Sequence, residues 1–160
     1  MNKDTEKAFS WIIKILEENN IPYRISGGFA ARAHGVQRDL ADIDIEIPED
    51  FLKIIENKAG KYITRPLELF VDENWKIKLL TIIYYGQEID ICSSKSEIFN
   101  QQTKKWDSSF VDLEDNIKIK IYGKLVNIEP VDSLISYKTK LDREVDREDI
   151  LQLKKIYNFN

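Results

Sequence analysis

The stretch that decides the fold is YRISGGFAARAHGVQRDLADIDIEIPED, from Tyr23 to Asp50. It places two adjacent glycines, Gly27 and Gly28, directly after a short apolar run. Further along, acids alternate with isoleucine in the segment DIDIEI, residues 42–47. Strict alternation of this kind predicts a β-strand with one apolar face and one acidic face.

The acidic face of this strand is unusual because it gathers like charges. Successive side chains of a strand point to opposite sides, so Asp42, Asp44 and Glu46 share one face and the isoleucines share the other. Like charges in a row repel one another unless a cation lies among them. Carboxylate oxygens favour Mg²⁺ over softer metals. A solvated acidic face without a bound ion is the alternative interpretation.

A third aspartate, Asp90, has similar surroundings. It lies in EIDIC, residues 88–92, between two isoleucines of a second apolar segment. Aspartate is disfavoured in strands, so two strands that each carry it between isoleucines predict a shared acidic pocket. The pair Gly27-Gly28 adds a complementary feature, because a strand that ends in glycines before a helix exposes backbone N–H groups to a phosphate.

The rest of the chain predicts an α/β or α+β fold, in which a small mixed β-sheet is flanked by helices and followed by C-terminal helices. We expect helices at 4–20, 29–34, 51–58, 131–141 and 144–157, and strands at 23–26, 42–47, 75–85, 88–92 and 117–121. Gly86-Gln87 is the expected turn between strands 75–85 and 88–92. No internal repeat or Pro/Gly/Ser-rich linker interrupts the sequence, so residues 1–160 are expected to form a single domain.

Composition excludes several classes of protein. With 42% hydrophobic and 32% charged residues, the chain is typical of globular proteins. The single cysteine, Cys92, and the single histidine, His34, exclude a disulfide framework and a His/Cys zinc cluster within one chain. The sequence has no apolar segment of membrane-spanning length, and its formal net charge is −4. We therefore expect a cytoplasmic protein that does not bind nucleic acid in bulk.

Together these motifs resemble the nucleotidyltransferases of the DNA polymerase β superfamily. The matching segments are Gly27-Gly28, Asp42-Ile43-Asp44-Ile45 and Ile89-Asp90-Ile91. They look most like the small lincosamide-type and other minimal nucleotidyltransferases. The segment LISYKTKLDREVDREDI, residues 134–150, is similar to the lysine and R..D..D helix that closes many such domains.

The resemblance implies a Mg²⁺-dependent enzyme that moves a nucleoside monophosphate, AMP from ATP, to an acceptor hydroxyl and releases pyrophosphate. It implies that Asp42 and Asp44 hold Mg²⁺, and that Asp90 completes the metal site and acts as the general base. Gly27 and Gly28 would cradle the β- and γ-phosphates.

Two cations, Arg38 and Lys138, are further candidates for phosphate binding. Arg38 precedes the acidic strand, from where its guanidinium could fold back towards the phosphates. The alternatives are a surface arginine and a solvated lysine on an amphipathic helix. The three charged residues of the R..D..D motif are expected to form an ion network; they are Arg143, Asp146 and Asp149.

The sequence does not identify the acceptor: an antibiotic-like small molecule, a protein hydroxyl or an RNA end would each fit. Because the chain is short, we expect a homodimer or a partner subunit to complete the acceptor side. The competing interpretation is a non-catalytic or antitoxin-type interaction module that has the same fold.

Overall fold

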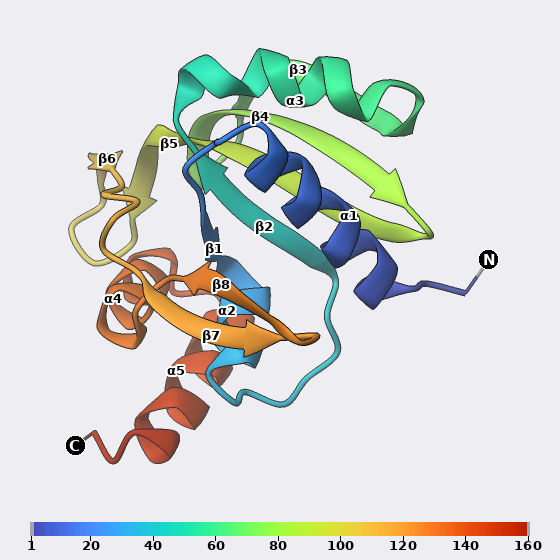
Figure 1. Ribbon diagram of the computed structural model, residues 1–160. Coiled ribbons are helices and arrows are strands. Elements are labelled where there is room, and N and C mark those ends of the chain that lie inside the picture. The colour runs from blue at the N-terminus through green and yellow to red at the C-terminus, as the bar shows by residue number, and fades with distance from the viewer. Residues whose placement is uncertain (1, 160) are drawn as a thin grey trace.

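Eight strands form one mixed sheet in the computed structural model, which describes residues 2–159 (Figure 1). Their order is β3-β4-β5-β2-β1-β8-β7, and β6 pairs with β5. The strands are β1 Arg24–Ser26, β2 Asp42–Ile47, β3 Ile63–Val71, β4 Trp75–Tyr84, β5 Gln87–Asn100, β6 Lys105–Phe110, β7 Ile117–Ile121 and β8 Lys124–Ile128. The predicted fold class, a mixed sheet with flanking and C-terminal helices, is confirmed.

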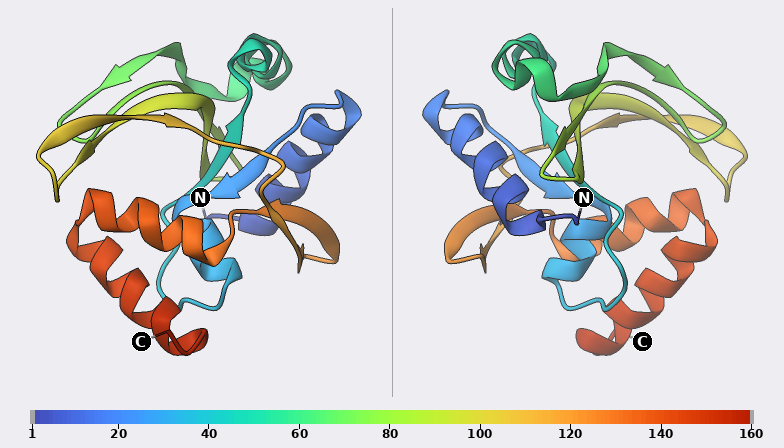
Figure 2. Two further views of the ribbon diagram at one scale, coloured as in Figure 1. Left: turned by 90° about the vertical axis from the view of Figure 1, so that its left-hand side faces the viewer. Right: turned by 90° about the vertical axis from the view of Figure 1, so that its right-hand side faces the viewer.

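The helices lie on both sides of the sheet. They are α1 Thr5–Glu18, α2 Gly27–Ala33, α3 Leu52–Ala59, α4 Val131–Leu141 and α5 Glu144–Ile156, with short 3-10 turns at Glu49–Phe51 and Gly60–Tyr62. Figure 2 shows α1 and α3 on one side, and α4 and α5 on the other side beneath the curved strands β3 to β6. Among residues 2–159, no helix combines the length and the apolar character that crossing a membrane requires.

The alternation in β2 determines how the sheet is packed. Ile43, Ile45 and Ile47 are fully buried, whereas the acids between them are only partly buried. The isoleucines join a core that includes the apolar face of α1, where Phe9, Ile12 and Leu16 are at most 1% exposed. The predicted two-faced strand is therefore confirmed, and its acidic side faces away from this core.

Strand register brings the three sequence motifs together. Strand β2 pairs in parallel with β5, and Asp44 lies directly opposite Asp90. On its other edge β2 pairs with β1 in antiparallel fashion, and Asp44 lies opposite Ser26. Because Gly27 follows Ser26, the glycine pair lies next to Asp44, directly after the C-terminal end of β1.

The hairpin of β4 and β5 differs from the prediction in one detail. Its turn is at Tyr85-Gly86, one residue earlier than expected, and both residues have positive φ (47° and 73°). Two positive φ angles are what a tight two-residue hairpin turn requires, and a glycine provides one of them without strain. Strand β5 also continues well past residue 92 to pair with β6, which the sequence patterns did not predict.

Candidate active site

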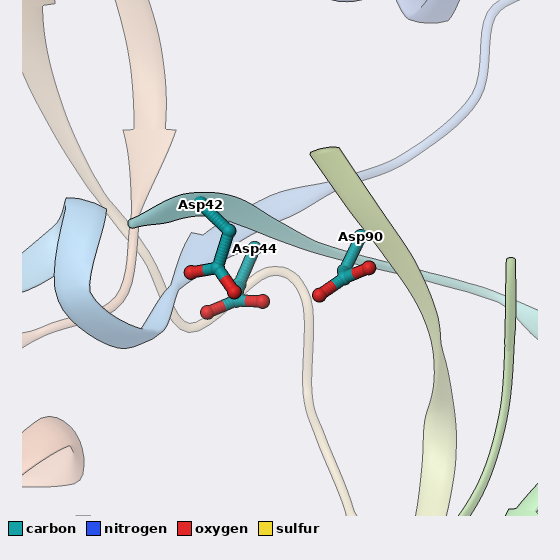
Figure 3. A group of neighbouring side chains, drawn as sticks. All are labelled: Asp42, Asp44 and Asp90. Atoms are coloured by element: carbon teal, nitrogen blue, oxygen red, sulfur yellow. The ribbon is translucent and has the colours of Figure 1, made fainter. Parts of the chain in front are cut away.

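Three carboxylates converge on one side of the sheet. Figure 3 shows Asp42 and Asp44 from β2 and Asp90 from β5 directed into the same space. One oxygen atom from each side chain lies within 4.8 Å of the others. Thr81, opposite Asp90 on β4, donates a hydrogen bond of 2.6 Å from its hydroxyl to Asp90 Oδ1. The sequence prediction that these acids share a pocket agrees with this geometry.

The electrostatics of the triad favour a bound cation. Burial raises the pKa of Asp90 to about 6. Burial also raises the pKa of Asp44 well above its ordinary value, and the neighbouring charges of Asp42 and Asp90 raise it further. These shifts mean that three ionised carboxylates here repel one another. A hard divalent cation such as Mg²⁺ would relieve this repulsion, and an all-oxygen donor set of this spacing fits such an ion.

The two glycines make room for side chains of the site itself. Gly27 has a φ of +62°, and a Cβ atom there would collide with Asp44 Oδ2. At Gly28 a Cβ atom would lie 2.6 Å from Arg38 Nη2. Both glycines therefore allow a functional side chain to lie against the start of α2, which is a different reason from the phosphate contact that the sequence indicates.

Arg38 and Lys138 both lie at this site, held by acids of α5. The guanidinium of Arg38 donates to both oxygens of Asp149, at 2.7 Å from Nε and 3.0 Å from Nη2. The ammonium of Lys138 is 2.9 Å from Asp149 Oδ2 and 3.4 Å from Asp146 Oδ1. Lys138 is 2% exposed, so the interpretation of a solvated helix lysine is wrong.

A third cation, Arg143, belongs to the same group. It donates to Asp146 from Nε at 2.7 Å and from Nη2 at 3.0 Å, and it lies over the Trp75 ring at 5.1 Å from the centroid. The Trp75 indole N–H in turn donates to Tyr137 Oη at 2.7 Å. The expected ion network of the R..D..D motif is therefore present, and it also includes Arg38 and Lys138.

A cavity of about 630 Å³ connects these groups. Its lining includes the aspartates, the glycine pair and the cations Arg38, Arg65, Lys138 and Arg143. Apolar and aromatic side chains also line it, among them Phe70, Trp75, Ile77, Leu79 and Tyr137. Pockets with a few converging polar groups on an apolar lining are typical binding sites for small molecules.

Glu46 has a different role from the other acids of β2. Arg24 donates to it from Nε at 3.2 Å, and the same guanidinium reaches Glu129 Oε1 at 3.4 Å. Ser133 also donates to Glu129 Oε1, at 3.1 Å. The acidic row of β2 therefore divides into two members of the triad, Asp42 and Asp44, and one acid, Glu46, that lines the same cavity but is held in an ion network.

The histidine and the cysteine do not form part of the triad. His34 is buried at the C-terminal end of α2, where its ring nitrogens contact Tyr157 Oη at 2.6 Å and the Glu129 carbonyl oxygen at 2.8 Å. These contacts give His34 a packing role. Cys92 is a free cysteine of intermediate burial that lines the cavity.

Solved structures share this architecture. A proposed nucleotidyltransferase from Thermotoga maritima is similar over 98% of this chain and 96% of its own, with a TM-score of 0.69 and 17% identity. The lincosamide antibiotic adenylyltransferase LnuA, in a lincomycin-bound structure, is similar over 97% of this chain and 99% of its own (TM-score 0.63, 18% identity). ANT(2″)-Ia, in complex with adenylyl-2″-tobramycin, is similar over 96% and 93% (TM-score 0.59, 16% identity). The chain has a nucleotidyltransferase fold. No protein-family model and no curated protein sequence matches it.

The sequence patterns assigned no function to Thr81 and Tyr137, which both lie at the site of this nucleotidyltransferase fold. The β4–β5 hairpin places Thr81 opposite Asp90. Counting the same number of residues in both directions from the Tyr85-Gly86 turn would have predicted this pair. Tyr137 precedes Lys138 on α4, but no sequence pattern indicates that it meets Trp75 across the cavity.

Proposed function

We propose that this protein is a Mg²⁺-dependent nucleotidyltransferase that moves AMP from ATP to a hydroxyl of an acceptor and releases pyrophosphate. The observation that carries the proposal is the convergence of Asp42, Asp44 and Asp90 opposite the Gly27-Gly28 turn, inside the cavity of a nucleotidyltransferase fold.

The proposed chemistry gives each group a role. Asp42 and Asp44 would hold Mg²⁺ with the help of Asp90. A bound Mg²⁺ neutralises phosphate charge that develops during the reaction. Gly27 and Gly28, with Arg38 and Lys138, would bind the phosphate chain on the opposite side.

Asp90 is the proposed general base. The acceptor oxygen forms a bond to the α-phosphorus, the bond from that phosphorus to the bridging oxygen breaks, and pyrophosphate leaves. The hydroxyl proton passes to Asp90. In the metal-free protein a pKa of about 6 leaves this carboxylate mostly ionised at pH 7, which is the form that accepts a proton. Thr81, through its hydrogen bond, fixes the orientation of Asp90.

A small hydroxylated molecule is the proposed acceptor. The apolar and aromatic residues of the cavity lining, among them Phe70 and Leu79, support this choice over a charged polymer. LnuA and ANT(2″)-Ia also support it, because the former is lincomycin-bound and the latter holds adenylyl-2″-tobramycin.

A second copy of the chain is proposed to complete the acceptor side. Strand β3 is at the edge of the sheet and its residue Phe70 lines the cavity, so a second copy that pairs with this edge would lie beside the acceptor side. Light scattering after size exclusion tests this proposal. A strict monomer at high concentration would exclude the homodimer.

The transfer reaction is tested with ATP labelled at the α-phosphate, Mg²⁺ and a panel of hydroxylated small molecules, proteins and RNA ends. We expect label on one acceptor and release of pyrophosphate. Asp90→Asn should lower the rate by about 10²-fold or more, the usual contribution of a general base. Asp50→Asn, an exposed acid outside the cavity lining, is the matched control. A protein that binds Mg²⁺–ATP without transfer would instead be the non-catalytic module.

A further inference from the structure

Two buried acids on one turn of α5 hold cations from three separate segments. Asp146 and Asp149 are both 0% exposed. Their partners are Arg38 from the loop before β2, Lys138 from α4 and Arg143 from the α4–α5 connection. Burial alone would raise the pKa of Asp149, but hydrogen bonds from Arg38 and Lys138 hold it below its ordinary value. The carboxylate is therefore ionised and bound to its partners at neutral pH.

The cations in this network still have donors to offer. A lysine ammonium has three N–H groups, and Lys138 contacts two carboxylates among residues 2–159. An arginine has five N–H groups, and Arg38 uses three of them, for Asp149 and for the Asp39 carbonyl oxygen at 3.3 Å. Both side chains also line the cavity that contains the aspartate triad.

Arg38 is fixed from a second direction. Its Nη2 atom lies 2.6 Å from the position that a Cβ atom of residue 28 would take, so the guanidinium lies close against Gly28. Asp149 holds the guanidinium on one side and Gly28 lies against it on the other, so Arg38 has a defined position in the cavity lining.

We propose that Asp149 is a positioning residue, which holds Arg38 and Lys138 in the orientation that binds the phosphate chain of the nucleotide. This role rests on the proposed nucleotidyl transfer. Arginine and lysine side chains lose considerable rotamer freedom when they bind a ligand. A partner that fixes them beforehand removes part of that cost from the binding step.

Electrostatics alone predicts the opposite effect, which makes the proposal testable. Asp149 is negatively charged, so it opposes a polyphosphate by Coulomb repulsion. If it acted only through charge, its neutralisation in Asp149→Asn would strengthen phosphate binding. If it acts through position, the same substitution weakens binding, because Arg38 loses a bidentate partner.

The experiment is a calorimetric titration of the full chain with inorganic tripolyphosphate in Mg²⁺ buffer. Wild type is expected to bind, and Asp149→Asn to bind at least tenfold more weakly. Asp142→Asn is the matched control: it removes the partner of Arg147 in an exposed pair at the same helix corner, 2.8 Å apart, and should change affinity less than twofold. Circular dichroism verifies the fold of each variant.

A second variant covers the case in which Asp149→Asn does not fold. Asp149→Glu keeps the charge that neutralises the buried cations but moves the carboxylate by one methylene group. We expect affinity to fall at least threefold. Unchanged or stronger binding by either folded variant, or no binding by wild type, would overturn the proposal. Transfer activity is measured separately, so wild type that binds tripolyphosphate but transfers nothing would refute the proposed function and leave the phosphate site intact.

Discussion

The glycine pair after β1 shows how single residues shape the site. A Cβ atom at Gly27 would lie 2.3 Å from Asp44 Oδ2, and one at Gly28 would lie 2.6 Å from Arg38 Nη2, so each would displace the side chain that it meets. The two collisions differ in kind, because Gly27 also has a left-handed backbone that L-residues adopt only with strain. Gly28 lies within α2, where alanine is intrinsically favourable.

This difference predicts separate outcomes for two alanine variants. Gly27→Ala should lower the free energy of unfolding by about 1–2 kcal/mol or more through backbone strain, and should also disturb Asp44. Gly28→Ala should lower stability less than Gly27→Ala, because its backbone is helical, and should weaken Mg²⁺–ATP binding, because it displaces Arg38 from Asp149. Denaturant titration and calorimetry measure the two effects. Gly123→Ala is the control for strain alone, since Gly123 has a φ of +81° and an added Cβ atom there meets nothing within 4 Å.

Asp44 provides a second prediction at the residue scale. Its pKa is raised by burial and by the charges of Asp42 and Asp90, so the ionised form destabilises the metal-free protein. Asp44→Asn should therefore raise the free energy of unfolding by about 1 kcal/mol in chelator-containing buffer. The same variant should lose stabilisation by Mg²⁺. If wild type and Asp44→Asn had the same melting temperature both with and without Mg²⁺, Asp44 would be a solvated acid that binds no ion.

At the scale of elements, sequence periodicity predicted the helices and strands whose pattern is complete within one segment of the chain. The alternation in DIDIEI gave the bounds of β2, Asp42–Ile47, and the apolar spacing gave α4, Val131–Leu141. Strands β3, β6 and β8 were not located, and β8 depends on pairing with β7 and β1. Strands β3 and β6 have no fully buried residue and lack a clean alternation. Their place depends on pairing with β4 and β5, which is a tertiary property.

The junction of β1, β2 and the β8–α4 connection predicts a pH dependence of stability. Glu129 shares Arg24 with Glu46, and its Oε2 atom is buried without a hydrogen-bond partner among residues 2–159. Burial, followed by the charge of Glu46, raises the pKa of Glu129 to about 8 from an ordinary 4.5. Between these values the folded state binds more protons than the unfolded state, so stability falls as pH rises from about 4.5 to about 8.

Glu129→Gln imitates the protonated acid and should remove this fall. Its amide oxygen can still accept from Arg24 and Ser133. We expect the variant to match wild type near pH 5 and to exceed it in free energy of unfolding at pH 8.5, as measured by urea titration at both values. Glu114→Gln, at an exposed position, is the control. A difference between variant and wild type that does not change with pH would contradict the assignment of the proton to Glu129.

At the scale of the whole molecule, the site combines parts that are far apart in sequence. The aspartate triad could be predicted because each member has apolar neighbours in the sequence, Ala41 and Ile43 around Asp42 and isoleucines around Asp44 and Asp90. The partner of Arg38 could not be predicted, since Asp149 lies 111 residues away and meets it only when α5 packs below the sheet. The sequence motifs therefore predicted the carboxylates that are proposed to bind Mg²⁺. The cations that are proposed to bind phosphate are brought into position by helix packing.

This arrangement predicts that ATP stabilises the molecule strongly only when Mg²⁺ is present. Ligands that bind the native state raise stability by mass action, by about 2.7 kcal/mol at a concentration 100 times Kd. For a chain of this size that corresponds to a rise in Tm of roughly 5–10 °C. We expect this rise with Mg²⁺–ATP, and a much smaller one with ATP in chelator, because the triad repels an unneutralised triphosphate.

Two variants distinguish the sides of the cavity in the same melting experiment. Asp42→Asn should reduce the rise by weakening the metal side, and Arg38→Gln should reduce it by weakening the phosphate side. Asp50→Asn should retain the full rise, because its exposed side chain is not part of the cavity lining. If all three proteins showed the same rise as wild type, the nucleotide would bind elsewhere, and the convergence of Asp42, Asp44 and Asp90 would have to be explained without it.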